Sequence, residues 1–182
     1  RTRTQAGIVV DEELALTYAA VWCATRIISE TAAGLPLHLF RRKSDGSRAH
    51  VKDSPLQILL TYPNPAMGTM AFREGRTAHQ VNWGNGFAEI ERAGNGEPIA
   101  LWPIHPGRVR PARANDKYAS GQSIPEGYYL IRNNDNTQMT VAPKEMLHVP
   151  GPISEDGIWG KGVIQHARES MLVHQPHRFL AA

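Results

Sequence analysis

The sequence predicts an α+β fold in which a small, strongly bent antiparallel sheet or partial barrel is flanked by helices. Three observations favour this class: helical periodicity near both ends of the chain, period-two alternation around a glycine-rich turn in residues 83–113, and further short strand-like segments. The 182 residues can bury a core of their own, and 13 prolines with 16 glycines indicate many turns. One loop-rich domain, or one domain with an appendage, is therefore expected.

The chain is expected to begin with a flexible polar arm at residues 1–10, followed by a long amphipathic helix. Asp11 is a suitable N-cap for this helix, and Gly34 and Pro36 stand at the usual stop positions after about six turns. Apolar and small residues recur along it at three- and four-residue spacing, so Trp22 is expected in the core.

A short basic hairpin and a short helix are expected next. Residues 36–42 have the composition of a strand, and a Ser-Asp-Gly turn joins them to a partner strand near residues 49–52. Ser54 followed by Pro55 is typical of a helix start, and the prolines on either side of Asn64 end that helix.

A second long helix is expected from Thr69, as its cap, to about Trp83. Its turns are marked by Met70, Arg73, Thr77, Gln80 and Val81, so its apolar face is thin. Such a polar helix must lie on the surface or be sandwiched by a partner, because it has little to bury against its own domain.

The clearest pattern in the chain is the hairpin in residues 83–113. On its first arm Phe87 and Glu89 alternate with Ala88, so one face can be buried and the other exposed to water. Glycine and asparagine in the turn at residues 93–96 tolerate the positive φ that a tight reversal demands.

The return arm of this hairpin ends in a proline-bounded corner at residues 102–106. The corner is expected to be rigid and to fix the direction of the segment that follows. That segment carries a basic surface formed by Arg108, Arg110 and Arg113.

A second hairpin is expected over residues 128–141, with a short strand at residues 147–149. Glycine-rich residues 158–162 then lead into a helix that runs from Val163 to at least Val173. The predicted organisation is therefore an arm at residues 1–10, an α/β domain at 11–157, and a hinge with the start of a helical continuation at 158–182. Because the chain begins at Arg1 and its last helix has no stop signal, a fragment of a longer protein is expected.

The overall charge hints at polyanions or acidic partners without demanding them. The formal net charge is +3 and comes mostly from arginine. The single cysteine, Cys23, cannot form a disulfide or a cysteine-based zinc site within one chain, which favours a reducing compartment. No apolar run approaches the roughly 20 residues of a membrane span, so a soluble protein is expected.

Catalytic patterns are not found in this sequence. Gly160-Lys161-Gly162 before a helix invites a phosphate-loop interpretation, but Glu155 stands where the first glycine is needed and Gly162 where Ser or Thr is needed. A flexible turn is the preferred interpretation. His166, His174 and His177 could share part of a helical face, yet no carboxylate or cysteine lies beside them at ligand spacing. No nucleophile elbow is present either. We therefore predict no catalytic, cofactor-binding or metal-binding residue, and no enzyme.

Several stretches, taken in order, carry a resemblance to a known family. They are AVWCATRIISE with GLPLHLF, PLQILL with PNP, MAFRE with NGFAEI, LWPIHP with RV, and EMLHV with GIWG. Together they resemble the portal proteins of tailed bacteriophages or prophages, over roughly residues 15–173. One departure is that the family usually carries a Gly-x-Ser where this chain has Gly160-Lys161-Gly162.

The resemblance implies that the chain is the α/β wing domain of a structural portal protein. Such proteins form a ring, commonly of twelve copies, at one capsid vertex of the virion, and assemble in the cytoplasm of the bacterial host. The terminase motor drives double-stranded DNA through the ring, and the major capsid and head-tail connector proteins contact it. The stem, clip and crown that line and cap the channel are not in this chain.

The resemblance gives the two basic clusters a role in contacts with DNA, a neighbouring subunit or the capsid. The candidate residues are Arg41, Arg42, Lys43, Arg108, Arg110 and Arg113. Scattered arginines suit a conduit that grips phosphates weakly and without sequence preference. Two alternatives stay open: a basic nucleic-acid-binding adaptor, which predicts tight and strongly salt-dependent duplex binding, and a metal-dependent nuclease, which needs a metal site.

Overall fold

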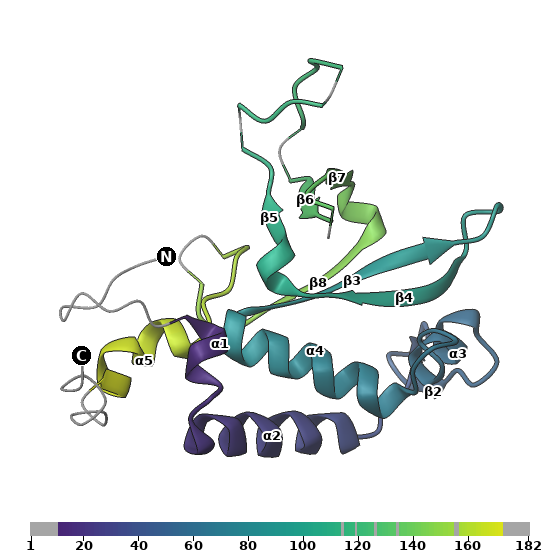
Figure 1. Ribbon diagram of the computed structural model, residues 1–182. Coiled ribbons are helices and arrows are strands. Elements are labelled where there is room, and N and C mark those ends of the chain that lie inside the picture. Colours follow the sequence, from purple (N-terminus) through teal and green to yellow (C-terminus); the bar gives the residue numbers. More distant parts are fainter. Residues whose placement is uncertain are drawn as a thin grey trace, which may run out of the picture.

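The computed structural model describes residues 11–113, 115–118, 120–125, 127–133, 135–154 and 157–172 (Figure 1). The expected arm at residues 1–10 and the histidines at 174 and 177 lie outside these ranges. The helices are α1 Glu12–Ala15, α2 Ala19–Gly34, α3 Pro55–Thr61, α4 Thr69–Trp83 and α5 Val163–Leu172. The strands are β1 Phe40–Arg42, β2 Arg48–His50, β3 Asn85–Arg92, β4 Pro98–Ile104, β5 Val109–Pro111, β6 Tyr129–Arg132, β7 Gln138–Val141 and β8 Met146–Pro150.

The first predicted helix is divided in two, so the prediction of one continuous helix is wrong. Asp11 caps α1 as expected, since its carboxylate accepts a hydrogen bond of 2.9 Å from the backbone N–H of Leu14. The chain then turns at residues 16–18, where the Thr17 hydroxyl donates to the Leu14 carbonyl oxygen. The break lets α1 pack against α5 while α2 packs against α4.

The buried side of α2 is small and polar, which contradicts the expectation for Trp22. The residues that face inward are Thr25, Ser29 and Ala33, whereas Trp22 is 53% exposed. The Thr25 hydroxyl donates to Asn82 Oδ1 on α4 over 3.1 Å. Small side chains allow the two helix backbones to approach closely, so the larger apolar side chains of α2 are left on its outer surface.

Helix α4 lies between α2 and the sheet of its own chain, so the expectation that it has little to bury against its own domain is wrong (Figure 1). Its N-cap is Gly68 rather than Thr69, which is the first helical residue and donates its hydroxyl to the Thr61 carbonyl oxygen. Gly84 ends the helix with a φ of 80°, the left-handed geometry that glycine adopts without strain. Because α4 has neighbours on two sides, it needs no wide apolar stripe of its own.

The central sheet has the strand order β4-β3-β8, and all its pairs are antiparallel. Phe87 and Ala88 on β3 are both fully buried, because both faces of the sheet are covered at that point. Ala88 packs in a cluster with Leu59, Phe72 and Leu101 on the helix side. The expectation of one wet face therefore fails at the base of the hairpin.

The face of β3 that carries Phe87 is covered by a second antiparallel sheet, β5-β6-β7. The cluster between the two sheets contains Phe87, Ile104, Val109, Ile131, Val141 and Met146. A third sheet consists of the β1-β2 hairpin alone. The predicted α+β class is confirmed, and the described strands form three small antiparallel sheets without a closed barrel.

The Pro63-Asn64-Pro65 element protects the outer edge of β4. The Asn64 side chain is buried and donates a 2.8 Å hydrogen bond to the Leu101 carbonyl oxygen. The Leu101 N–H in turn donates to the Pro63 carbonyl oxygen over 2.6 Å. These bonds satisfy backbone groups that an edge strand would otherwise leave open.

Residues 157–162 pack closely against the end of α4. A Cβ atom on Gly160 would lie 1.9 Å from the Gly84 carbonyl oxygen, and one on Gly162 would lie 1.9 Å from the Asn82 carbonyl oxygen. The Gly160–Gly162 turn leads into α5 as predicted. The reason for its glycines is close backbone approach, however, and not the chain flexibility inferred from the sequence.

Asn85 fastens this turn to the start of β3. Its Nδ2 donates to the Gly160 carbonyl oxygen over 2.8 Å, and its Oδ1 accepts from the Gly160 N–H over 2.9 Å. Oδ1 lies 2.9 Å from His148 Nε2, so Nε2 carries the proton and Nδ1 accepts from the Tyr129 hydroxyl at 3.2 Å. Burial lowers the pKa of His148, which agrees with a neutral ring held in one tautomer.

Within the described residues, no helix combines the length and the apolar character that a membrane span requires.

Candidate functional site

The corner after β4 places the predicted arginines at the edge of the β5-β6-β7 sheet. Residues Pro106–Arg108 form a single 3-10 turn, and His105 Nδ1 accepts a 3.1 Å hydrogen bond from the Gly107 N–H. The proline fixes the backbone at the first position of this turn, which redirects the chain from β4 into β5. Arg108 ends the turn and Arg110 lies in the middle of β5.

Arg108 reaches across to the neighbouring strand. Its Nε donates to the Arg132 carbonyl oxygen over 2.8 Å, so its guanidinium is held beside the end of β6. The register pairs Val109 with Ile131, which sets Arg108 next to Arg132. The sheet therefore adds Arg132 to the two predicted arginines.

Three arginines line one shallow hollow of about 190 Å³. Its walls are formed by Gly107, Arg108, Val109, Arg110, Leu130, Ile131, Arg132 and Gln138. Three cationic groups around one hollow create a positive potential, which attracts phosphate or carboxylate groups of a partner. Sequence reasoning missed Arg132, because the pairing of β5 with β6 spans a long loop that leaves no local signal.

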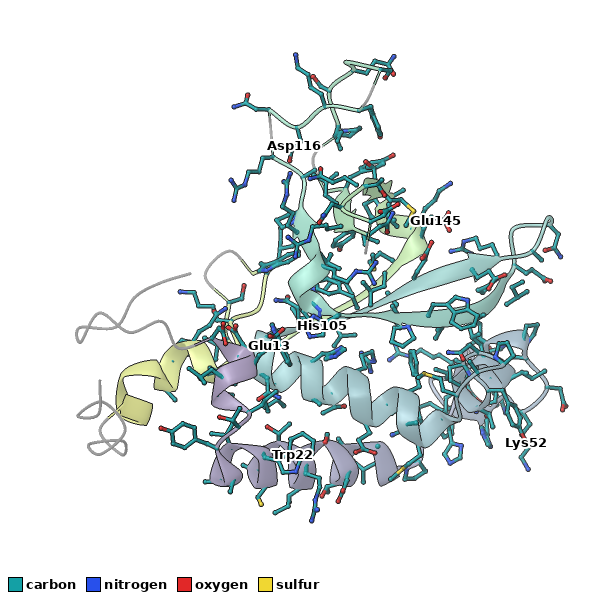
Figure 2. The ribbon with its side chains drawn as sticks, in the orientation of Figure 1. Glu13, Trp22, Lys52, His105, Asp116 and Glu145 are labelled. Carbon is teal, nitrogen blue, oxygen red and sulfur yellow. The ribbon has the colours of Figure 1, made fainter. Side chains whose placement is uncertain are left out.

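Arg110 is partly neutralised by an ion pair. Its Nη1 and Nη2 donate to the two carboxylate oxygens of Asp116, over 2.7 and 2.9 Å. Hydrogen bonds from Arg110 and from the backbone N–H of Arg113 lower the pKa of Asp116 to about 2 (Figure 2). The carboxylate stays charged throughout the physiological pH range. Arg110 therefore remains paired with Asp116 and fixes the loop that follows β5. Arg108 and Arg132 then contribute most of the positive potential.

The other predicted cluster lies in a different part of the molecule. Arg41, Arg42 and Lys43 are exposed on the β1-β2 hairpin, beside α3 and away from β5 (Figure 1). Arg42 stands directly opposite Arg48 in the hairpin, so two like charges share one cross-strand position. Such a pair weakens the hairpin slightly and concentrates positive charge at its tip. Arg113 is also exposed, beyond the end of β5, so the six predicted residues do not form one patch.

A second, larger hollow lies between the start of α1 and the corner. It has a volume of about 500 Å³ and is lined by Asp11, Glu12, Glu13, Trp83, His105, Gly107, Arg108 and Arg132. Burial lowers the pKa of His105, and this is opposed by the charge of Glu13, which lies beside it in Figure 2. Acidic and basic groups thus face each other across this hollow.

An aromatic cluster supports the corner from the α4 side. The ring centroids of His105 and Trp83 are 4.7 Å apart, and those of His105 and His79 are 5.0 Å apart. Burial, together with the charge of His105, lowers the pKa of His79 to about 4. These histidines therefore pack as neutral rings.

The described residues contain no group of three or more histidine, cysteine, aspartate or glutamate side chains placed to hold a metal ion. The features that stand out are instead two basic surfaces, the β1-β2 hairpin and the hollow beside β5.

Comparison with known proteins gives the context of these surfaces. The family described as "Phage portal protein" matches residues 19–176. The chain belongs to the phage portal protein family. Its relative in Enterobacteria phage HK97, named "Portal protein", is 28% identical over 144 residues, which are 78% of this chain and 32% of the phage protein. This portal-family chain therefore spans about a third of the length of that relative.

Solved structures show the same fold. The neck of an empty gene transfer agent particle, computed with C6 symmetry, has a TM-score of 0.66 at 19% identity, covering 88% of this chain and 40% of that one. The neck of the native particle, computed with C12 symmetry, has a TM-score of 0.65 at 18% identity and covers 88% and 39%. An HK97-family portal protein from Corynebacterium diphtheriae has a TM-score of 0.57 at 19% identity and covers 95% and 47%.

Proposed function

We propose that this protein is a portal subunit whose copies form a ring at one capsid vertex. The ring serves as the conduit for double-stranded DNA during genome packaging and ejection, and as the docking point for terminase and the head-tail connector. The observation that carries this proposal is the family match over residues 19–176. Similarity of fold to proteins of a particle neck, one of which was computed with C12 symmetry, supports a ring of twelve copies.

This role makes the protein structural rather than enzymatic. Its place is in the virion, at the portal vertex beside the major capsid protein, after assembly in the cytoplasm of the bacterial host. The residue range 11–157 acts as the wing domain, and residues 158–182 act as the hinge into the helical part of the subunit. Tight packing of Gly160 and Gly162 against α4 supports a fixed exit direction for that helical part.

The two basic surfaces contact negatively charged partners in this assembly. The β1-β2 hairpin, with Arg41, Arg42 and Lys43, is suited to DNA phosphates or acidic capsid residues, because it is exposed and strongly positive. The hollow around Arg108 and Arg132 is suited to a carboxylate of a neighbouring subunit, because its arginines are partly held by the protein. Arg110 maintains the loop through Asp116.

Negative-stain electron microscopy of the full-length protein tests the proposal most directly. Rings of uniform diameter are expected at micromolar concentration, and monomers across a wide concentration range would refute it. Incubation with plasmid DNA and Mg²⁺ should leave the plasmid intact. Cleavage that a chelator abolishes would instead establish a nuclease.

The proline corner offers a second test of the structural role. Pro103 lies on β4 and Pro106 is buried at the start of the 3-10 turn, so both restrict the path into β5. Replacing both by alanine should lower the yield of rings. An unchanged yield would show that the corner is incidental to assembly.

A further inference from the structure

Helix α2 carries an apolar stripe that no described part of the chain covers. Along the helix the stripe consists of Ala20, Ala24, Ile27, Ile28 and Thr31, and Leu35 follows directly after the last helical residue; all six are exposed. The exposed fractions of Ile27, Ile28 and Leu35 are 61%, 48% and 60%. Soluble proteins rarely leave a continuous apolar surface open unless another molecule covers it.

The stripe is distinct from the side of α2 that packs on α4. At about 100° per residue, it lies roughly 150° around the helix axis from the buried residues Thr25, Ser29 and Ala33. The exposed ion pair between Arg26 and Glu30, at 3.4 Å, lies on the remaining side. No charged residue therefore interrupts the stripe along the length of the helix.

A second exposed apolar surface lies elsewhere on the molecule. It is a groove of about 210 Å³ between α3 and β4, lined by Pro55, Ile58, Leu59, Tyr62, Pro98 and Ile99. Ile58, Tyr62 and Ile99 are 58%, 71% and 53% exposed. All six lining residues are uncharged, as are those of the α2 stripe.

We propose that the α2 stripe of one copy packs into the α3–β4 groove of the next copy around the ring. This inference rests on the ring assembly proposed above. In a closed cyclic ring each subunit joins its neighbour head to tail, so every copy must offer two different surfaces that fit each other. An apolar helix face and an apolar groove are such a pair, and helices commonly dock into grooves in this way.

A second copy of this chain is the occupant that the observations favour. The solved neck structures with C6 and C12 symmetry have the same fold, which supports contacts between identical subunits. An uncharged helix face against an uncharged groove also avoids leaving an unpaired charge buried at the contact. The contact therefore suits a permanent interface between subunits.

Charge insertion in the full-length protein tests the stripe. Ile27→Glu should lower ring yield at least ten-fold, because a carboxylate would be buried in the neighbour's groove. The melting temperature of the monomer should stay unchanged, since Ile27 is exposed within one copy. Ala19→Glu is the matched control, because Ala19 is exposed on the same side as Arg26 and should assemble normally. Normal ring yield from Ile27→Glu would overturn the inference.

Cross-linking then identifies the partner surface independently of folding effects. Cysteines are placed at Ile27→Cys and Ile58→Cys in a Cys23→Ser background, because the native Cys23 is exposed on α2. A short bismaleimide should convert rings of the double variant into a ladder of covalent oligomers beyond the dimer, and should leave either single-cysteine variant monomeric.

Each other outcome has a definite meaning. Covalent dimers from Ile27→Cys alone would show that two α2 helices face each other, which overturns the inference. Intact rings whose double variant gives no cross-link would overturn the inference and leave the proposed function standing. Absence of rings from both the wild-type protein and the Cys23→Ser parent would refute both.

Discussion

The close packing at Gly162 leads to a strong prediction about stability. In Gly162→Ala, the new Cβ would lie 1.9 Å from the Asn82 carbonyl oxygen, 2.6 Å from its carbonyl carbon and 3.0 Å from the Gly84 nitrogen. All three atoms belong to the backbone, so no side chain can rotate away. The turn and the end of α4 must separate by about 1.5 Å before the contact becomes ordinary.

That separation would break the hydrogen bonds that fasten the turn. The Gly160 N–H donates to Asn85 Oδ1 over 2.9 Å, and Asn85 Nδ2 donates to the Gly160 carbonyl oxygen over 2.8 Å. Loss of these two bonds costs about 1 kcal/mol each, and overpacking adds about 1 to 3 kcal/mol. We therefore expect Gly162→Ala to lower the free energy of unfolding by about 3 to 5 kcal/mol.

Urea denaturation followed by tryptophan fluorescence measures this change. Gly75→Ala and Gly94→Ala are matched controls, because a Cβ at either position meets nothing within 4 Å. Gly75→Ala, within α4, should raise stability by about 0.5 to 1 kcal/mol, and Gly94→Ala should change it little. If Gly162→Ala unfolds within about 0.5 kcal/mol of the wild type, the close approach of the two backbones is refuted.

Three further predictions concern other parts of the molecule. Asn64→Ala should cost about 1 to 3 kcal/mol in urea denaturation, since it leaves the Leu101 carbonyl oxygen unpaired; an equal loss in the exposed control Asn95→Ala would contradict this reason. The pKa of His79 is about 4 when folded and 6.5 when unfolded, so the unfolded state takes up the proton first and stability falls as pH drops from about 6.5 towards 4. Changing His79→Phe should reduce the loss of stability between pH 7 and pH 4 by about 2 to 3 kcal/mol, and an unchanged pH dependence would argue against a buried neutral ring. Asp116→Asn should free Arg110 and strengthen binding of heparin, measured by the salt concentration of elution, whereas weaker binding would show that the loop geometry matters more than the charge.

Patterns that depend on a few neighbouring residues were predicted well. The cap at Asp11, the Ser54-Pro55 start of α3, the bounds of α4 to within a residue, and the β3-β4 and β6-β7 hairpins all agree with the structure. Each of these depends on local hydrogen bonds or on side-chain periodicity. The family resemblance was also visible, because it rests on the order and spacing of such local patterns.

The errors arose where packing between distant segments decides the outcome. Periodicity placed Trp22 and Thr25 on one face of the helix and could not tell which of them meets α4; Thr25 makes that contact, whereas Trp22 is exposed. The division of the first helix likewise follows from α5, which lies about 150 residues further along and packs on α1.

In the candidate site too, local patterns were predicted from the sequence, whereas contacts between distant segments were not. The sequence marked Arg108, Arg110 and Arg113 as a basic segment by their spacing alone. Only the pairing of β5 with β6 added Arg132, and only the fold of the intervening loop brought Asp116 to Arg110.

The sequence by itself determined the class of the fold, the order of its elements and the family. These properties follow from the local conformational preferences of the residues and from the spacing of short motifs. The tertiary structure decided which helix face is left open, why Gly160 and Gly162 must be glycines, and which arginines share a hollow. The physical reason is that steric contact and charge pairing between residues far apart in the chain depend on distances of a few ångströms, which exist only once the layers have packed.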